Sequence, residues 1–63
     1  MKTINEKVKA VGSLVNMDQA VRLISNLGGT VIGLGNFEVC FIDNGEAKSI
    51  RFVKNSSGWI EMA

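Results

Sequence analysis

The first part of the chain has a hydrophobic pattern with helical spacing. Over residues 3–27, apolar side chains recur every three or four positions, and charged residues stand between the early ones. The pair Gly12-Ser13 weakens this pattern and is expected to end or bend a first helix. The apolar positions of this first segment are Ile4, Val8, Val11 and Val15.

A second helix is predicted more strongly than the first. Asn16 is a favoured N-cap residue, with Asp18 in the first turn and Gln19 three positions after the cap, as in a capping box. Gly28-Gly29 provides a left-handed stop at the other end. The apolar face of this helix is broad and comprises Met17, Ala20, Val21, Leu23, Ile24 and Leu27.

From Thr30 onward the hydrophobic period becomes two, which is typical of β-strands. Four short strands are expected, at 30–34, 37–43, 46–55 and 59–62. Each break between them has turn chemistry. The predicted turns are a two-residue turn at Gly35-Asn36, a two-residue turn at Asn44-Gly45, and a three-residue loop at 56–58 with Gly58 in the left-handed conformation.

These turns fix the register of each strand pair, and the registers agree with the hydrophobic pattern. They place Leu34 opposite Phe37, Val39 opposite Ile50, and Phe52 opposite Met62. A slip of one residue would send a strand's apolar set to the wrong face. The side chains predicted to share the core side of the sheet are Ile32, Leu34, Phe37, Val39, Phe41, Ile50, Phe52, Ile60 and Met62.

The pattern therefore predicts an α+β fold of order α-α-β-β-β-β. One helix, or two, should pack on one face of a four-stranded antiparallel meander. The chain has 63 residues, 46% of them apolar, and no linker or repeat, so residues 1–63 are expected to form a single compact domain.

The opposite face of the predicted sheet is also partly apolar. Because so small a domain cannot cover both faces, this face should be open and is predicted to contact another protein. Glu38 falls directly opposite Arg51, where the two are expected to form a cross-strand ion pair, and Trp and Arg are frequent in binding hot spots. The residues expected to bind are Trp59, Arg51, Glu38, Val53, Val31 and Ile42. The alternatives are that Val and Ile serve β propensity only, and that Trp59 folds over the sheet edge into the core.

The edge strands offer a second route to association. The predicted strand 30–34 has neither proline nor charge, so it lacks the usual protection against pairing with a partner strand or a second copy. Gly33 inside it is expected to mark a bulge or the close approach of another chain. The alternative is that the C-terminal strand or the first helix shields this edge.

Composition argues against catalysis and against a metal or cofactor. The chain has no histidine, which removes the commonest general base and metal ligand. The single cysteine, Cys40, cannot form an internal disulfide or a zinc site, which favours a reducing, cytoplasmic setting. No apolar run reaches the length of a membrane span, and the first residues do not form a signal peptide.

The most favoured function is that of a small non-enzymatic protein-binding module or inhibitor, with no small-molecule substrate, which covers a surface of a partner protein or pairs with its own copy. Small proteins of this kind are often phage or mobile-element products that block a host factor. The alternative is a nucleic-acid-associated module, although the net charge of +1 gives it little electrostatic support. It would use Lys2, Lys7, Lys9, Arg22, Lys48 and Lys54.

Overall fold

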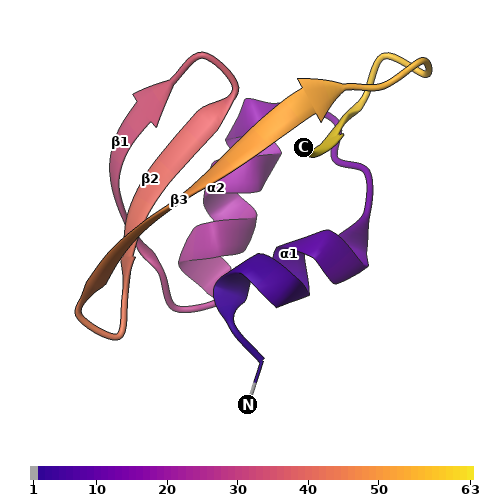
Figure 1. Cartoon of the computed structure of the whole chain (residues 1–63). Coiled ribbons are helices and arrows are strands. Elements are labelled where there is room, and N and C mark those ends of the chain that lie inside the picture. Colours follow the sequence, from indigo (N-terminus) through magenta and orange to yellow (C-terminus); the bar gives the residue numbers. More distant parts are fainter. Residues whose placement is uncertain (1) are drawn as a thin grey trace.

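The computed structural model describes residues 2–63 and has two helices followed by a four-stranded antiparallel sheet (Figure 1). The strands lie side by side in the order β1-β2-β3-β4. This arrangement confirms the predicted α+β fold and its element order. The elements are α1 (Ile4–Val11), α2 (Met17–Asn26), β1 (Thr30–Gly35), β2 (Glu38–Asp43), β3 (Glu46–Lys54) and β4 (Ile60–Met62).

The helix boundaries follow from capping residues. The Gln19 N–H donates to Asn16 Oδ1 over 3.1 Å, and Gln19 Oε1 accepts from the Val15 N–H over 3.3 Å, which is a capping-box arrangement at the start of α2. Gly28 follows α2 with a φ of 99°. Gly12, with a φ of 85°, ends α1 and does not merely bend it.

The registers from β2 to β4 are as predicted. Val39 pairs with Ile50, and Phe52 pairs with Met62. Asn44 and Gly45, in the tight turn between β2 and β3, both have positive φ angles. This is the backbone conformation for which an Asn-Gly pair is favoured. These three strands therefore present the expected residues to the core.

The register of β1 was predicted wrongly. The turn comprises Asn36 and Phe37, so that Gly35 faces Glu38 and Leu34 faces Val39. A register shift between Val31 and Gly33 then inserts one residue into β1, which confirms the bulge expected near Gly33. Because a bulge reverses the alternation of side chains, Val31 takes a place on the core side that the pattern had given to Ile32.

Three residues predicted to be in the core are therefore exposed. Leu34 is 64% exposed and Ile32 60% exposed, and Phe37 stands in the turn with a φ of 57°. Leu34 shares the side of its partner Val39, but it lies at the end of an edge strand, next to the turn. The period of two alone could not reveal the inserted residue.

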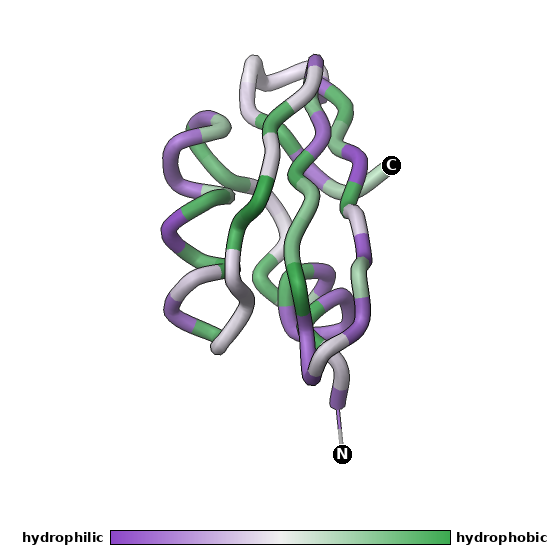
Figure 2. The backbone as a smooth tube through the Cα atoms, turned by 90° about the vertical axis from the view of Figure 1, so that its left-hand side faces the viewer, coloured by the Kyte–Doolittle hydropathy of each residue, from purple (hydrophilic) through white to green (hydrophobic). Residues whose placement is uncertain are grey.

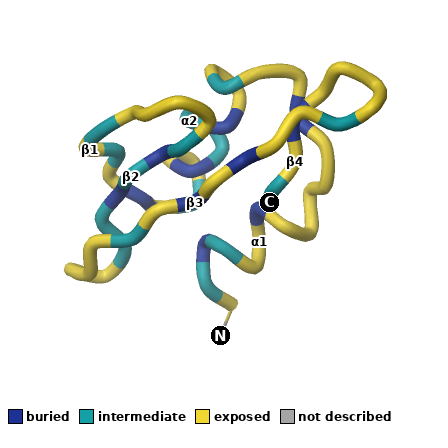
Figure 3. Tube along the Cα trace, turned by 45° about the horizontal axis from the view of Figure 1, so that its top comes forward, coloured by how far each residue is buried: buried dark blue, intermediate teal, exposed yellow. Residues whose placement is uncertain are grey.

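A single apolar cluster lies between the helices and one face of the sheet. It contains residues of both helices and alternate residues of β2 and β3, while the intervening strand residues are exposed or half-buried (Figure 3). Figure 2 shows α2 on one side of the sheet, with neither helix on the other side. The buried core residues are Ile4, Val8, Leu14, Ala20, Ile24, Val39, Phe41, Ile50, Phe52 and Ile60.

The connection between the helices is extended and runs beside β4 (Figure 1). The Leu14 N–H donates to the Ile60 carbonyl over 2.7 Å, and the Ile60 N–H donates to the Leu14 carbonyl over 2.8 Å. Val15 therefore does not continue the helical stripe of Ile4 and Val8, contrary to the sequence pattern. The connection acts as a one-bridge extension of the sheet and occupies the outer edge of β4 at Ile60.

Candidate protein-binding face

The side of the sheet turned away from the helices is the candidate binding face, and we call it the outer face. Side chains along a strand alternate between the two sides, so the residues that lie between buried ones point outward. No helix of residues 2–63 covers this side (Figure 2). The outer face carries Glu38, Cys40, Ile42, Ala47, Ser49, Arg51, Val53, Trp59 and Glu61.

Trp59 is held on the outer face by the loop between β3 and β4. The Asn55 N–H donates to the Trp59 carbonyl over 2.8 Å, and Asn55 Oδ1 accepts from the backbone N–H groups of Ser57 and Trp59. Gly58 has a φ of 85°, as expected for a loop closed by a left-handed residue. Trp59 precedes the buried Ile60 and is 46% exposed, so its ring does not complete the core.

Two valines extend the apolar surface around Trp59. Val53 lies on β3 opposite Glu61, diagonally adjacent to Trp59 in the paired strands, and it is 45% exposed. Val15 follows Leu14, and the antiparallel bridge of Leu14 to Ile60 puts Val15 next in register to Trp59, so we infer that the two side chains are neighbours; Val15 is 48% exposed. We call Val15, Val53 and Trp59 the Trp59 patch.

Val15 is the member of this patch that the sequence pattern missed. It fitted the helical spacing of Ile4 and Val8, and the signals against a helix there were Gly12-Ser13 before it and the N-cap Asn16 after it. Together those signals leave room for an extended connection, but nothing in the local sequence shows that it pairs with β4.

Glu38 and Arg51 lie directly opposite each other, as predicted. The expected ion pair between them is absent. The salt bridge found within residues 2–63 joins Lys48 Nζ to Asp43 Oδ2 over 3.2 Å. Arg51 is exposed and Glu38 half-buried, so the guanidinium of Arg51 stays available beside Val53. Glu38 and Arg51 thus border the Trp59 patch, and neither charge is paired with the other.

The remaining predicted site residues lie apart from this patch. Ile42 is on the outer face but four positions further along β2 than Glu38, opposite Ala47. Val31 packs against the core, because the bulge in β1 turns it inward, and its predicted place on the open face was wrong. The candidate site is therefore the Trp59 patch with Arg51 and Glu38.

The six cations of the alternative nucleic-acid hypothesis are spread over the molecule. Lys2, Lys7 and Lys48 border one cleft, where Lys48 is paired with Asp43. Arg22 lies on α2, beside a different hollow. Lys9 stands at the end of α1 and Lys54 at the end of β3. A binding groove for a phosphate backbone needs cations gathered on one surface, which this distribution does not provide.

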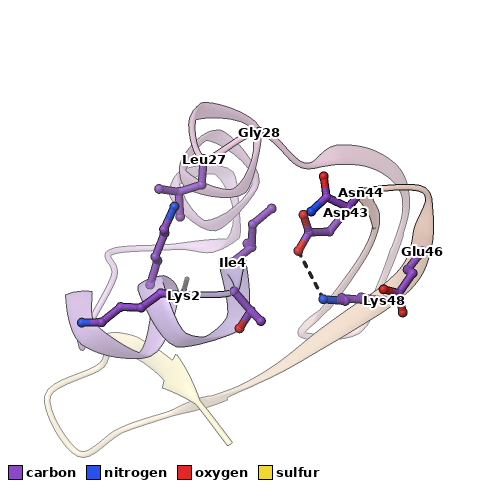
Figure 4. A pocket seen from close by; sticks show the side chains of 10 residues that line it. Lys2, Ile4, Leu27, Gly28, Asp43, Asn44, Glu46 and Lys48 are labelled. Atoms are coloured by element: carbon purple, nitrogen blue, oxygen red, sulfur yellow. Dashed lines mark hydrogen bonds and ion pairs between the residues drawn. The ribbon is translucent and has the colours of Figure 1, made fainter.

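A hollow of about 430 Å³ opens between the start of α1 and the turn that joins β2 to β3 (Figure 4). Ile4 and Leu27 form its apolar part, and the Asp43–Lys48 pair stands on one wall. Its charges are mixed and partly paired with each other. The residues present do not form a recognisable nucleophile with a general base, so the cleft itself indicates no reaction.

Residues 2–63 contain no cluster of three or more His, Cys, Asp or Glu side chains placed to hold a metal ion. None of the helices in this part of the chain is both long and apolar enough to cross a membrane. Comparisons of the chain with protein-family models, with curated proteins and with solved structures find no match.

Proposed function

We propose that this protein is a non-enzymatic protein-binding domain that covers part of a partner's surface with its outer face. The observation that supports this most is the Trp59 patch, three apolar side chains exposed by nearly half on a sheet face that neither helix covers. Aromatic and arginine side chains contribute most to protein interfaces, and Trp59 and Arg51 lie on one side of the same sheet.

The partner's surface should be apolar at its centre with an acidic or polar rim. Trp59 would be buried at the centre of the interface, while Val15 and Val53 exclude water around it. Arg51 is unpaired within the described chain and would meet an acidic group of the partner. A rim charge of this kind sets orientation and association rate more than affinity.

The chain has one cysteine, so an internal disulfide is impossible and a cytoplasmic site of action is part of the proposal. An inhibitor that blocks a host factor, as a phage or mobile-element product does, is the biological form that suits so small a binding module. The proposal does not depend on that origin.

The test is affinity capture from the source cell with the wild-type chain and with Trp59→Ala. We expect a specific protein to co-purify with the wild type and to be reduced at least tenfold by Trp59→Ala, since hot-spot truncations cost about 2 kcal/mol or more. Val11→Ala is the matched control, because Val11 is equally exposed but lies at the end of α1.

Two results would overturn the proposal. One is a captured protein that binds both variants equally well. The other is a capture that consists of nucleic acid and weakens steeply with salt, which would favour the module that uses Lys2, Lys7 and the other cations. Circular dichroism of Trp59→Ala should match the wild type, because the side chain lies outside the core.

A further inference from the structure

The two edges of the sheet differ in what covers them. At β4, the backbone of Ile60 is paired on both sides, with β3 and with Leu14 of the helix connection. At β1, the backbone hydrogen bonds of Thr30–Gly35 run to β2 alone within the described chain. The bridge covers the outer edge of β4 at Ile60 only, but β1 has no such cover at any residue, so the longer free edge of the described chain is the outer side of β1.

The hydrogen-bond pattern shows which groups point outward. The Phe52 N–H donates to the Phe37 carbonyl over 2.7 Å. Phe37 directly precedes β2, so the backbone N–H and carbonyl groups of the odd-numbered residues of β2 point toward β3. The backbone N–H and carbonyl of Val39, two positions further on, therefore also point toward β3. The pair of Val39 with Leu34 is consequently of the non-hydrogen-bonded type. The N–H and carbonyl of Leu34 consequently point away from the sheet, toward solvent.

The edge also lacks the features that protect edge strands. Proline and charged residues are absent from Thr30–Gly35, and in Figure 2 this strand faces the viewer with no hydrophilic position along it. Leu34 is 64% exposed. The bulge between Val31 and Gly33 is the one protective device, and it limits the regular stretch to Gly33–Gly35.

Gly33 itself is not required by the fold of the single chain. A Cβ atom there would meet nothing closer than Cys40 Cβ at 3.9 Å, and its φ is outside the left-handed range. A glycine within a strand is typical of a bulge or of a place where another backbone approaches closely; Gly33 adjoins the bulge, and its missing side chain also leaves the edge open to a second strand.

We propose that β1 pairs in antiparallel fashion with β1 of a second copy, around a two-fold axis at Leu34. In this register the Leu34 N–H of each copy donates to the Leu34 carbonyl of the other, and Gly33 faces Gly35 of the second copy. A second copy fits better than a foreign strand for two reasons. The strand carries no charge to select or repel a partner, and two-fold symmetry doubles every contact of so short an edge.

This dimer uses a different surface from the Trp59 patch and is independent of the proposed function. It makes one continuous eight-stranded sheet from two four-stranded ones and leaves both outer faces open. The two surfaces can therefore be tested by separate variants.

The first test is the mass in solution by analytical ultracentrifugation over a concentration series. We expect a species of twice the 6.8 kDa chain mass for the wild type. Leu34→Lys should give a monomer, because two like charges would meet at the axis. Val11→Lys, of similar exposure, should remain dimeric. A wild type that is monomeric throughout the series, or a dimer that Leu34→Lys leaves intact, would overturn the proposal.

The second test yields a positive signal and does not depend on loss of association. In a hydrogen-bonded antiparallel pair the Cα atoms are about 5.5 Å apart, which suits a disulfide. Leu34→Cys combined with Cys40→Ser should therefore form an intermolecular disulfide rapidly with oxidised glutathione. Val11→Cys in the same Cys40→Ser background should not. Equal rates for the two variants would contradict the register, and Trp59→Ala should leave the cross-link of Leu34→Cys unchanged.

Discussion

Two glycines four residues apart, Gly29 and Gly33, are present for different physical reasons. Gly29 is buried, and a Cβ atom there would lie 2.7 Å from Ile24 Cγ2 and 3.1 Å from Ile4 Cδ1. Its glycine is thus needed for the close approach of the helices to the start of β1. Gly33 has no such neighbour in its own chain.

We therefore predict opposite effects for two alanine substitutions. Gly29→Ala should lower the free energy of unfolding by about 1–3 kcal/mol through overpacking against Ile24. Gly33→Ala should leave it unchanged or raise it by up to about 1 kcal/mol, because alanine loses less backbone entropy. Urea denaturation of both variants, measured with Leu34→Lys also present so that association does not contribute, gives the comparison. Equal destabilisation by the two substitutions would contradict the packing around Gly29.

Asn55 is the residue that positions the main element of the candidate site. Its Oδ1 accepts from Ser57 and Trp59, and its Nδ2 donates to Ser13 Oγ over 3.1 Å, which links the β3–β4 loop to the helix connection. Asn55→Ala should lower the free energy of unfolding by about 0.5–1.5 kcal/mol, because the exposed loop N–H groups exchange their Asn55 acceptor for water. Ser13→Ala removes only the Nδ2 contact and should cost less.

The same substitution has a second readout that reports on Trp59 alone. Trp59 is the single tryptophan of the chain, and there is no tyrosine. Its fluorescence anisotropy should therefore fall in Asn55→Ala, as the loop loses its internal hydrogen bonds. An unchanged anisotropy in a folded Asn55→Ala protein would show that Asn55 does not hold the ring in place.

At the scale of elements, α2 depends on its cap as well as on its apolar face. Asn16→Ala should lower the free energy of unfolding by about 1 kcal/mol, because the Gln19 N–H loses its acceptor at the helix start. Asn26→Ala, at the last residue of α2, is the matched control and should be neutral or slightly stabilising, since alanine is the better helix former. Thermal unfolding, followed by the helical signal in far-ultraviolet circular dichroism, checks both variants.

The elements also show what the sequence could predict and where it had to fail. Capping and turn residues are local signals, so both helices, the Asn44-Gly45 turn and the registers from β2 to β4 followed from them. The β1–β2 turn had no such unique signal. Gly35-Asn36 is good turn chemistry, whereas the observed turn places Phe37 at a positive φ that local preference disfavours.

Long-range pairing explains the remaining errors. The bulge in β1 lets Val31 fill the core, and this gain is visible only when the whole sheet is assembled. In the same way, Val15 joins Trp59 through a bridge between segments that are 46 residues apart, Leu14 and Ile60. The registers of β2 to β4 put Glu38, Arg51 and Val53 on the outer face as expected, whereas the bulge in β1 takes Val31 off it. That these residues bind a partner stays a prediction.

At the scale of the whole molecule, charge is expected to contribute little to the proposed binding. The net charge is +1, and the cations are dispersed over α1, α2, β3 and the first residues. If the Trp59 patch supplies most of the affinity, the dissociation constant for the captured partner should change little between about 50 and 200 mM salt. The affinity of a phosphate-binding surface for nucleic acid would instead fall by several orders of magnitude over that range of salt. Isothermal titration at both salt concentrations distinguishes the two.

The most direct test of the binding face uses the fluorescence of Trp59 in the free protein and after saturation with the captured partner. For the free chain, the account predicts emission typical of a solvated indole and ready quenching by acrylamide, in the wild type and in Leu34→Lys alike. With the partner bound, the emission should shift to the blue and the quenching constant should fall severalfold. Emission and quenching that stay the same at full saturation would contradict the assignment of the outer face as the binding surface.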